Sequence, residues 1–372
     1  MDLTKFPRRK YTPHETPIEY MPRLSKAVSN DNDRVNLWIK RDDMLGLTGG
    51  GNKTRKLEFV MADALAQGAD TIVTCGAVQS NHCRLTLSAC VKEGLKCCLV
   101  IEERVPDSYK EDASGNNYLF HLLGVERIIQ VGLGEAPAKM EEWAKELREQ
   151  EGRNVYVCPG GASNEIGATG YCACAQEIQY QLFKEQLPRF DAIVTASGSG
   201  GTHSGLVAGM TALRCDIPII GISTRHPKDK QTDHIHKLAV KTYQHVLGDT
   251  AAELPVDAVT VYDDYVGPGY SLPTPEMAEA VTLFARTEGI LLDPVYSGKA
   301  AAGFLDLVRQ GTFPAGSNIL FIHTGGAPTL YHYQPLAPEV SVPQNEGKPM
   351  TRKNSDATDV VTDEDDSTDD DN

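Results

Sequence analysis

A lysine stands one residue after a run of glycines in the first part of the chain, in the stretch GGGNKTRKLEF. Three roles are open to such a lysine: holding a nucleotide phosphate in a P-loop, forming a covalent bond with a carbonyl group, or simply beginning a helix. A P-loop needs its lysine directly after a glycine, whereas Asn52 separates Lys53 from Gly51. The stretch is therefore a poor match to a nucleotide hydrolase, and a covalent role for Lys53 stays open.

A second glycine-rich turn, TASGSGGTHSG, follows the apolar run DAIVTAS and precedes a helical pattern. Backbone N–H groups exposed at the start of a helix form a good site for a phosphate group. The residues that would form this site are Gly198, Ser199, Gly200, Gly201 and Thr202. Their spacing lacks the GxGxxG pattern of a dinucleotide-binding fold, so we expect a single phosphate. A tight turn between a strand and a helix, with no ligand, is the alternative interpretation.

A third stretch, GAVQSNHCR, also lies between an apolar run and a helical pattern. Ser80 and Asn81 are residue types that cap helix N-termini, where free N–H groups would bind a substrate carboxylate. Asn81 could also donate a hydrogen bond to a hydroxyl group on a cofactor ring. Ordinary helix capping explains these two residues equally well.

Together, Lys53 and the glycine-rich turn match the requirements of pyridoxal 5'-phosphate. A lysine bonds to the aldehyde of this cofactor, and a separate site binds its single phosphate. Lys53 alone would not justify this hypothesis, but the combination makes pyridoxal phosphate the leading one. We predict no metal site, because the chain has no CxxC pair and no histidines at zinc spacing near its cysteines.

Short apolar runs alternate with longer helical patterns along most of the chain, as in proteins built from βαβ units. The predicted strands are Asp70–Val78, Lys96–Glu102, Glu126–Val131, Asn154–Cys158, Asp191–Ser197, Ile217–Thr224 and Asn318–Thr324. Apolar residues recur with helical spacing over Thr54–Gln67. Thr274 and Pro275 predict the start of another helix, which Gly289 ends. We therefore expect an α/β fold with parallel sheets covered by helices on both faces.

The chain has 372 residues, enough for about two domains. More than half of its net charge of −15 lies near the C-terminus, because residues 354–372 contain nine acidic residues and no lysine or arginine. We expect residues 341–372 to form a disordered acidic tail, since they lack the apolar side chains that a core needs.

Other classes of protein are excluded by what the sequence lacks. The sequence has no basic stripe of the kind that binds nucleic acids. It also has no apolar run that approaches the roughly 20 residues of a membrane-spanning helix. The N-terminus has no apolar segment of the kind found in secretion signals. We therefore expect a cytoplasmic protein whose nine cysteines serve mostly as small buried side chains in a reducing compartment.

Six motifs, in order along about residues 5–335, resemble those of the D-cysteine desulfhydrase and 1-aminocyclopropane-1-carboxylate (ACC) deaminase family. They are GGGNKTRKLEF, QSNH, SGSGGTHSG, VGPGYSLP, LLDPVYSGK and IHTGGAP. The resemblance implies a pyridoxal-phosphate enzyme of fold type II (tryptophan synthase β-like) that acts on a small amino acid. It also implies a large domain of residues 1–53 and 164–340, a small domain of residues 54–163, an active site in the cleft between them, and a homodimer.

The resemblance assigns roles to individual positions. Lys53 corresponds to the lysine that holds the cofactor covalently, and its neighbour Asn52 belongs to the cofactor site. The other corresponding positions are Asn81 at the cofactor hydroxyl, Ser80 near the substrate carboxylate, Ser199, Gly200, Gly201 and Thr202 at the phosphate, and Tyr270 and Tyr296 as active-site tyrosines. As core residues, the two tyrosines would look the same in the sequence.

Two positions distinguish the reactions of this family. The deaminases have Glu after the DPVY tyrosine and Leu in HLGG, whereas this chain has Ser297 and Thr324 in the cofactor site. A carboxylate beside the pyridine nitrogen keeps that nitrogen protonated and the ring strongly electron-withdrawing, but a hydroxyl only donates a hydrogen bond. We therefore expect α,β-elimination with a good leaving group, most simply D-cysteine to pyruvate, hydrogen sulfide and ammonium.

Three alternatives stay open. Parts of the chain, including GISTRHPKDKQ, also resemble L-cysteate sulfo-lyase, which releases sulfite and would call for cationic groups near the substrate. Arg225, His226 and Lys228 could supply them, or could belong to a solvated basic loop. The second alternative is an ACC deaminase, and the third is a pyridoxal-phosphate-binding protein without catalytic activity.

Overall fold

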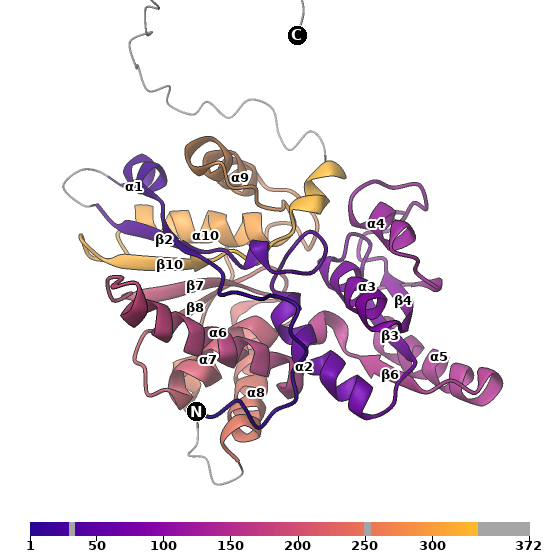
Figure 1. Ribbon diagram of the computed structural model, residues 1–372. Helices are drawn as coiled ribbons and strands as arrows, with labels where there is room; N and C mark the ends of the chain where they lie inside the picture. The colour runs from indigo at the N-terminus through magenta and orange to yellow at the C-terminus, as the bar shows by residue number, and fades with distance from the viewer. Residues whose placement is uncertain (30–33, 249–253, 334–372) are drawn as a thin grey trace, which may run out of the picture. The chain divides into compact units, whose positions relative to one another are not determined.

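Two β-sheets organise the part of the chain that the structure describes, which comprises residues 1–29, 34–248 and 254–333 of a computed structural model (Figure 1). The larger sheet has the order β1-β2-β10-β7-β8-β9, with β1 at Ile18–Tyr20, β2 at Asn36–Lys40, β7 at Ala192–Ser197, β8 at Ile219–Ser223, β9 at Thr260–Tyr262 and β10 at Asn318–Ile322. The smaller sheet has the order β5-β4-β3-β6, with β3 at Thr71–Ala77, β4 at Lys96–Glu102, β5 at Arg127–Val131 and β6 at Val155–Cys158. Every pair of neighbouring strands in these sheets is parallel except β1 and β2.

Helices cover both faces of each sheet, as parallel strands buried on both sides require (Figure 1). One face of the larger sheet carries α1 (Pro22–Val28), α9 (Pro275–Glu288) and α10 (Ser297–Arg309), and the other carries α6 (Glu165–Lys184), α7 (Gly201–Ala212) and α8 (Lys228–Leu247). The smaller sheet packs against α2 (Lys53–Ala66), α3 (Asn81–Glu93) and α4 (Asn116–Leu122) on one face and α5 (Ala136–Glu151) on the other. The 3-10 turns are η1 (Asp42–Met44), η2 (Gly160–Ala162), η3 (Val256–Ala258) and η4 (Ala327–Tyr331).

The apolar residues of the smaller sheet alternate between its two faces, which is why these short runs form strands. In β4, Leu99 and Ile101 pack toward α2 and α3, whereas Cys98 and Val100 pack toward α5. Both faces are apolar, so the run reads as continuously hydrophobic in the sequence.

The predicted fold class is confirmed, and each of the seven predicted strands is present close to its predicted ends. The helix predicted from Thr54 begins one residue earlier, and Thr274 caps α9 by accepting a hydrogen bond from the Met277 N–H. The sequence did not predict β1, β2 and β9. Two of these, β1 and β9, have only three residues each, which is too short for a strand-like pattern of apolar residues to be recognised.

The strands of the smaller sheet all lie between Thr71 and Cys158, inside the range 54–163 that we predict as the small domain. All of the described residues nevertheless belong to one compact unit. The domain boundaries therefore stay a prediction, and the acidic tail predicted at residues 341–372 lies outside the described residues.

The nine cysteines are free thiols, and none forms a disulfide. Seven are buried, and the exceptions are Cys75 in β3 and Cys215 after α7, which are half-buried. Burial raises the pKa of several of these thiols, including Cys98 to about 11.

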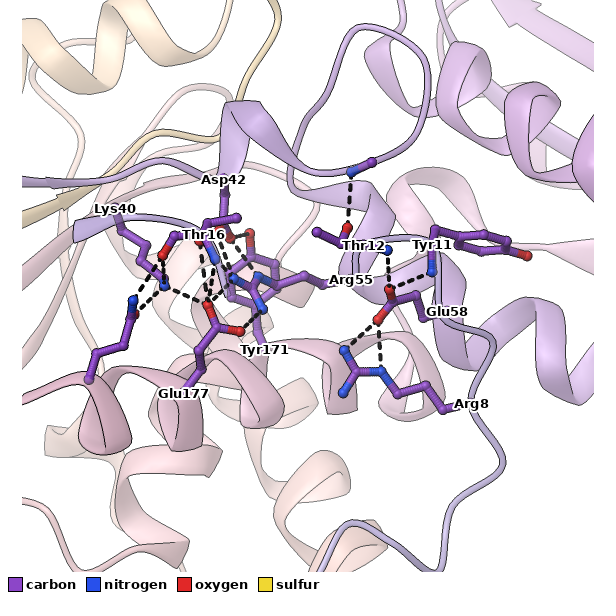
Figure 2. A network of polar contacts seen from close by, with 12 residues as sticks. Arg8, Tyr11, Thr12, Thr16, Lys40, Asp42, Arg55, Glu58, Tyr171 and Glu177 are labelled. Carbon is purple, nitrogen blue, oxygen red and sulfur yellow. Dashed lines mark hydrogen bonds and ion pairs between the residues drawn. The ribbon is translucent and has the colours of Figure 1, made fainter. Parts of the chain in front are cut away.

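Helix α2 lies between the two sheets and is buried on nearly every side, including the charged residues Arg55, Lys56 and Glu58. A buried charge is stable only when it is paired and hydrogen-bonded. Figure 2 shows the partners of Arg55, whose guanidinium lies between Asp42 of η1 and Glu177 of α6. Its Nε and Nη2 atoms donate to the two Asp42 oxygens at 2.8 Å each. Its Nη1 donates to Glu177 Oε2 at 2.8 Å.

Neighbouring groups satisfy the remaining oxygens of this network. The Tyr171 hydroxyl donates to Asp42 Oδ2 at 2.7 Å, and the Thr16 hydroxyl donates to Asp42 Oδ1 at 2.8 Å. Lys40, from β2, donates to the Glu177 carboxylate and to the Thr16 carbonyl. The Arg55 network therefore ties α2 to strand β2, turn η1 and helix α6, all of which belong to the larger sheet and its cover.

Glu58 anchors the same helix to the N-terminal segment (Figure 2). Its Oε1 accepts a hydrogen bond from the Tyr11 N–H at 3.0 Å, and its Oε2 accepts one from Arg8 Nε at 2.7 Å. Helix α2 is therefore fixed by polar contacts at two points, one turn apart, and both contacts lie close to Lys53.

The protonation of the Arg55 network follows from its charges. Burial opposes ionisation of Asp42 and Glu177, but Arg55 and Lys40 together outweigh burial and lower the pKa of both carboxyls, that of Glu177 to about 2. Because these pKa values are depressed in the folded state, the network stabilises the fold above about pH 4.5. That contribution is lost as the pH falls toward 2.

Replacing Arg55 with methionine keeps a long side chain but leaves the Asp42 and Glu177 carboxylates in the core without their shared cation. We expect the free energy of unfolding to fall by roughly 3–5 kcal/mol, the cost of removing one partner of a buried ion pair. Urea denaturation followed by circular dichroism measures this change.

The control is Arg189→Gln, which removes an ion pair to Asp216 whose side chains are 66% and 84% exposed. We expect it to change the free energy of unfolding by less than about 0.5 kcal/mol. Equal losses in the two variants would contradict the special importance of the Arg55 network.

Candidate active site

A cavity of about 360 Å³ lies where the carboxyl ends of strands from both sheets meet the N-termini of helices. This is the usual position of a binding site in α/β proteins. Seven of the predicted site residues line it: Lys53, Ser80, Asn81, Gly198, Ser199, Tyr270 and Tyr296. The structure therefore brings together residues from each of the three stretches that the sequence analysis selected, together with both tyrosines.

Lys53, the first residue of α2, presents its amine to this cavity. The amine lies 4.8 Å from the centre of the Tyr296 ring, and it forms no hydrogen bond or ion pair with any residue that the structure describes. Burial lowers the pKa of Lys53 to about 8, Asp293 opposes this shift and Arg84 adds to it. The amine is therefore free of partners and unusually easy to deprotonate.

The glycine-rich turn between β7 and α7 forms a cradle with no room for side chains. A Cβ atom on Gly201 would lie 2.9 Å from both the Lys56 amine and the Ser163 hydroxyl, and Gly200 has a φ of +96°. Thr202, in the first turn of α7, accepts a hydrogen bond from the Asn52 side chain at 2.8 Å. The cradle is thus linked directly to the residue before Lys53.

Lys56 is a second buried amine beside this cradle. It is only 1% exposed, and it donates to the Gly161 carbonyl at 3.1 Å and to the Ser163 hydroxyl at 3.4 Å. Burial, and then the charge of Lys53, lower its pKa well below the usual value. No described carboxylate pairs with Lys56, so a bound phosphate could supply the missing negative charge.

Ser80 caps α3 by accepting a hydrogen bond from the Cys83 N–H at 3.1 Å. The Oδ1 atom of Asn81 accepts a hydrogen bond from Asn116 at 2.7 Å, which fixes the orientation of the amide. Its Nδ2 group then points away from these partners and donates to none of the described residues. Capping and ligand binding are therefore compatible at this helix end: Ser80 is used by the helix, and the Asn81 N–H₂ is available.

The two tyrosines are held in different ways. The Tyr296 hydroxyl donates to the Ala196 carbonyl at 3.2 Å, so its ring is fixed as a wall next to Lys53. Tyr270 lies on the loop between β9 and α9, which buried Lys299 anchors by donating to the carbonyls of Val266 and Gly269 at 2.6 and 2.7 Å. Burial raises the pKa of both phenols, so both are neutral near pH 7.

Ser297 and Thr324 do not line the cavity. The Ser297 hydroxyl donates to Asp293 Oδ2 at 2.6 Å, so its proton is already committed. The Asp293 carboxylate also accepts the N–H groups of Val295, Tyr296 and Ser297, and so stabilises the start of α10. By contrast, the Thr324 Oγ1 atom is buried and has no hydrogen-bond partner among the residues that the structure describes, and the Thr324 carbonyl accepts the Asn52 N–H at 3.1 Å.

The comparisons with known proteins agree with this site. The model of the pyridoxal-phosphate-dependent enzyme family matches residues 10–325. The chain belongs to this family. It is 40% identical over 334 residues to the D-cysteine desulfhydrase of Salmonella typhimurium (strain LT2), with coverage of 90% of this chain and 98% of the relative. The D-cysteine desulfhydrase of Yersinia enterocolitica (serotype O:8) is 41% identical over 338 residues, with the same coverage.

Solved structures give the same family and fold. The crystal structure of an ACC deaminase homologue has a TM-score of 0.78 and 39% identity, and the match covers 89% of this chain and 95% of that chain. A pyridoxal-phosphate-dependent aspartate racemase has a TM-score of 0.59 at 18% identity, with coverage of 84% and 90%. The second likeness concerns the fold alone.

Three observations show that the residues around the cavity of this pyridoxal-phosphate enzyme fit its cofactor. Lys53 has an unpaired amine for the aldehyde. The cradle at Gly200 and Gly201, beside the uncompensated amine of Lys56, suits a phosphate. The unpartnered Thr324 hydroxyl, adjacent to Asn52, needs a group to bond with.

Lys56, Asp293 and Arg104 belong to the site but were not among the predicted site residues. Lys56 stands three residues after Lys53, a spacing that places two residues on one side of a helix, so this signal was available. Arg104 gave no signal, because its contact with Tyr270 joins segments that are far apart in the sequence; its guanidinium lies 4.4 Å from the Tyr270 ring centre. Arg225, which the sequence analysis considered, lines the cavity, whereas Lys228 is exposed.

The lowered pKa of Lys53 predicts how pH controls attachment of the cofactor to the apoenzyme. Only the neutral amine attacks an aldehyde, and with a pKa of about 8 the neutral fraction rises about fivefold between pH 7 and pH 8. We expect the attachment rate to follow this rise and to level off above about pH 9. Borohydride trapping of the bound cofactor at each pH, followed by mass spectrometry, measures the rate.

Lys53→Ala is the control, and it should trap no cofactor at any pH. A rate that keeps rising about tenfold per pH unit up to pH 10 would indicate an ordinary lysine. Trapped cofactor in Lys53→Ala would mean that another lysine forms the bond.

Proposed function

We propose that this enzyme catalyses α,β-elimination on small β-substituted amino acids, with D-cysteine as the substrate and pyruvate, hydrogen sulfide and ammonium as products. The support comes from the D-cysteine desulfhydrases that are 40–41% identical to this chain over nearly their whole length. The observation that carries the proposal is the unpaired Lys53 amine, which faces the same cavity as the N-terminus of α3. An amine that is easily deprotonated, next to a site for a carboxylate, suits removal of a Cα proton.

Lys53 would act twice in this reaction. When bound, pyridoxal phosphate supplies an electron sink that stabilises negative charge on the substrate Cα. Lys53 would first hold the cofactor and then, once the substrate amine has replaced it, accept the Cα proton at its own Nζ. Its lowered pKa favours the neutral form that this step needs.

The helix end at Ser80 and Asn81 would bind the substrate carboxylate. Free N–H groups and the positive end of the helix dipole both favour an anion at this position. The Asn81 amide, oriented by Asn116, would donate to the cofactor hydroxyl. Substrate and cofactor would therefore be aligned by one short turn of the smaller sheet.

The phosphate of the cofactor would be held by the cradle of Ser199, Gly200, Gly201 and Thr202. Asn52 supports the cradle through its 2.8 Å hydrogen bond to Thr202, and Lys56 would add a positive charge. Tyr296 would exclude water from the Lys53 amine, and Tyr270, neutral near pH 7, would donate a proton to the leaving group.

The hydrogen bonds of Ser297 and the free hydroxyl of Thr324 support elimination over ring opening. Ser297 directs its proton to Asp293, and the Asp293 carboxylate is occupied by three backbone N–H groups and the Ser297 hydroxyl. No free carboxylate among the residues that the structure describes is then available to protonate the pyridine nitrogen. The unpartnered Thr324 hydroxyl would donate a hydrogen bond to a neutral nitrogen, which suffices for a good leaving group.

Three further features remain part of the proposal: a homodimer, a cytoplasmic location, and a small domain at residues 54–163. The homodimer and the small domain rest on the family resemblance, and the location rests on the sequence alone. The structure adds one observation on membranes: no helix among the described residues is both long and apolar enough to span a bilayer.

A pyruvate assay on the cofactor-loaded enzyme tests the proposed function. We expect turnover of D-cysteine with stoichiometric release of sulfide, and little or no release of ammonium from ACC. Equal rates on ACC and D-cysteine would contradict the role given to Ser297 and Thr324. A protein that binds the cofactor but releases nothing from any β-substituted amino acid would be the non-catalytic alternative.

Thr324→Val tests the hydrogen bond to the ring nitrogen, because valine keeps the shape of threonine and removes the hydroxyl. We expect kcat on D-cysteine to fall roughly 3–10-fold, the value of one hydrogen bond, while KM changes little. Thr324→Ser restores the hydroxyl and should recover most of the loss. A wild-type kcat in Thr324→Val would show that this hydroxyl does not serve the reaction.

A further inference from the structure

A fully buried arginine contacts the glycines that precede Lys53. Arg84 lies in the first turn of α3, and its side chain is among the largest that are completely buried. Its Nη1 donates to the Thr48 carbonyl, and its Nη2 donates to the Gly50 carbonyl at 3.2 Å. The glycine run, which we define as Gly49–Gly51, is therefore held by a side chain of the smaller sheet's own cover.

The same guanidinium reaches Asn81 at the start of α3. Its Nη2 donates to Asn81 Oδ1 at 3.4 Å. That oxygen also accepts hydrogen bonds from Asn116 Nδ2 at 2.7 Å and from the Thr329 hydroxyl at 3.3 Å. One side chain thus bonds both to the backbone that leads to Lys53 and to the amide predicted to meet the cofactor hydroxyl.

Arg84 is bonded only by uncharged groups. No carboxylate among the described residues forms an ion pair with it, and its Nε is buried with no hydrogen-bond partner in the same part of the chain. Burial lowers the pKa of Arg84 to about 10, and Asp293 opposes this shift. A buried cation without a counter-charge costs free energy, and an apolar side chain of similar size would stabilise the core better. The stability of the fold therefore does not account for Arg84.

The glycine run needs an anchor of this kind. Its three residues all have positive φ, at 71°, 64° and 128°. Glycine has many accessible backbone conformations, so such a run keeps one of them only where its polar groups are bonded. The Arg55 network holds α2 after Lys53, and Arg84 holds the run before it. Ser88, one turn after Arg84, adds a neutral contact, since its hydroxyl accepts the Thr48 N–H at 3.2 Å.

Arg84 also acts on Lys53 through its charge. Burial lowers the pKa of Lys53 to about 8, and Arg84 adds to this shift, whereas Asp293 opposes it. The other titratable groups near the amine or on the same cavity wall are Lys56 on α2, His82 on α3, Tyr296 at the start of α10 and Tyr270 on the loop before α9. A second cation close to Lys53 favours its neutral form, which is the form that attacks an aldehyde.

The chemistry of the cofactor gives a reason for both contacts of Arg84. In pyridoxal phosphate the aldehyde and the hydroxyl occupy adjacent carbons of the pyridine ring, so Lys53 and Asn81 must reach neighbouring positions of one small ring. We propose that Arg84 is a positioning residue that fixes Lys53 and Asn81 relative to each other, by bonding the glycine run before the first and the amide of the second. This inference rests on the cofactor roles of Lys53 and Asn81 in the proposed function, and not on which amino acid is cleaved.

Attachment of pyridoxal phosphate to the apoenzyme, trapped with borohydride over a series of pH values, tests the inference without any amino-acid substrate. In Arg84→Gln we expect the rate on the plateau at high pH, where Lys53 is neutral in any case, to fall roughly tenfold or more, the effect of losing charge-assisted hydrogen bonds. The midpoint of the pH profile should also rise above that of the wild type, since a neutral glutamine no longer opposes a charge on Lys53.

The matched control is Ser88→Ala, which removes the other contact of α3 with Thr48 and keeps the guanidinium. We expect its plateau rate to fall less than about threefold, with an unchanged midpoint. Inorganic phosphate, as a competitor at the cradle of Gly200 and Gly201, should inhibit attachment equally in the wild type and in Arg84→Gln. Weaker inhibition in Arg84→Gln would place the defect at the cradle and overturn the inference.

A second variant keeps the test decisive if Arg84→Gln does not fold. A Cβ atom on Gly49 would collide with Arg84 Nη1, so Gly49→Ala displaces the guanidinium and keeps its charge. We expect slower attachment on the plateau, with a midpoint close to that of the wild type.

Combining Arg84→Gln with Asn81→Ala tests the link between the two contacts. If Arg84 acts through Asn81, the double variant should attach the cofactor faster than the product of the two single losses predicts. The inference is overturned by a wild-type plateau rate in either Arg84→Gln or Gly49→Ala, by equal losses in Arg84→Gln and Ser88→Ala, or by losses that multiply fully in the double variant.

Failure of this inference is distinguishable from failure of the proposed function, because attachment is measured before any substrate is added. An enzyme that releases pyruvate from D-cysteine, and whose attachment rate is unaffected in Arg84→Gln, refutes only the role of Arg84. One that attaches the cofactor at Lys53 but releases no pyruvate from D-cysteine refutes the proposed function.

Discussion

The ion-pair network of Arg55 with Asp42 and Glu177 is the interaction on which the rest of the site depends. It lies two residues after Lys53, and it joins the first turn of α2 to η1 and α6 (Figure 2). A lysine that bonds to an aldehyde must have its backbone held in one position. The glycines before it are flexible and cannot hold it there by themselves. The network fixes that position with several charge-assisted hydrogen bonds.

The same constraint explains the unusual composition of α2. A helix packed between the smaller sheet and α6 would ordinarily be apolar all round, yet α2 carries buried Arg55, Lys56 and Glu58. Two of them hold the helix in place, and the third lies beside the phosphate cradle without a carboxylate partner. The same stretch of α2 therefore serves two tasks. The paired charges of Arg55 and Glu58 hold the helix in position, and the unpaired Lys56 is available to a ligand.

The sequence was sufficient to predict the sheets and the centre of the site. Continuous apolar runs marked the parallel strands, and the residues after them, such as Ser80 and the turn at Ser199, necessarily meet at the carboxyl ends of the strands. Lys53 was predictable because its glycine neighbours are conspicuous. Contacts between distant segments were not predictable, and Arg104 on Tyr270 is one example.

Ser297 illustrates the limit of reasoning by position. Its place after the DPVY tyrosine predicts a contact with the cofactor, but its hydroxyl is directed to Asp293, four residues earlier. The local geometry of a helix start decides this, since a serine at such a point readily bonds a neighbouring carboxylate. Thr324, with no such neighbour, keeps its hydroxyl unpartnered. Both residues carry a hydroxyl, but only that of Thr324 is available to bond with a cofactor.

Cys75, one of the two half-buried cysteines, forms part of the cavity wall close to where a sulfur compound would react. Burial, and then the charge of Glu102, raise the pKa of this thiol to about 11. Near neutral pH it therefore stays protonated, and a protonated thiol is a poor nucleophile. It therefore does not compete with Lys53 for an aldehyde, and this part of the cavity wall is chemically inert near neutral pH.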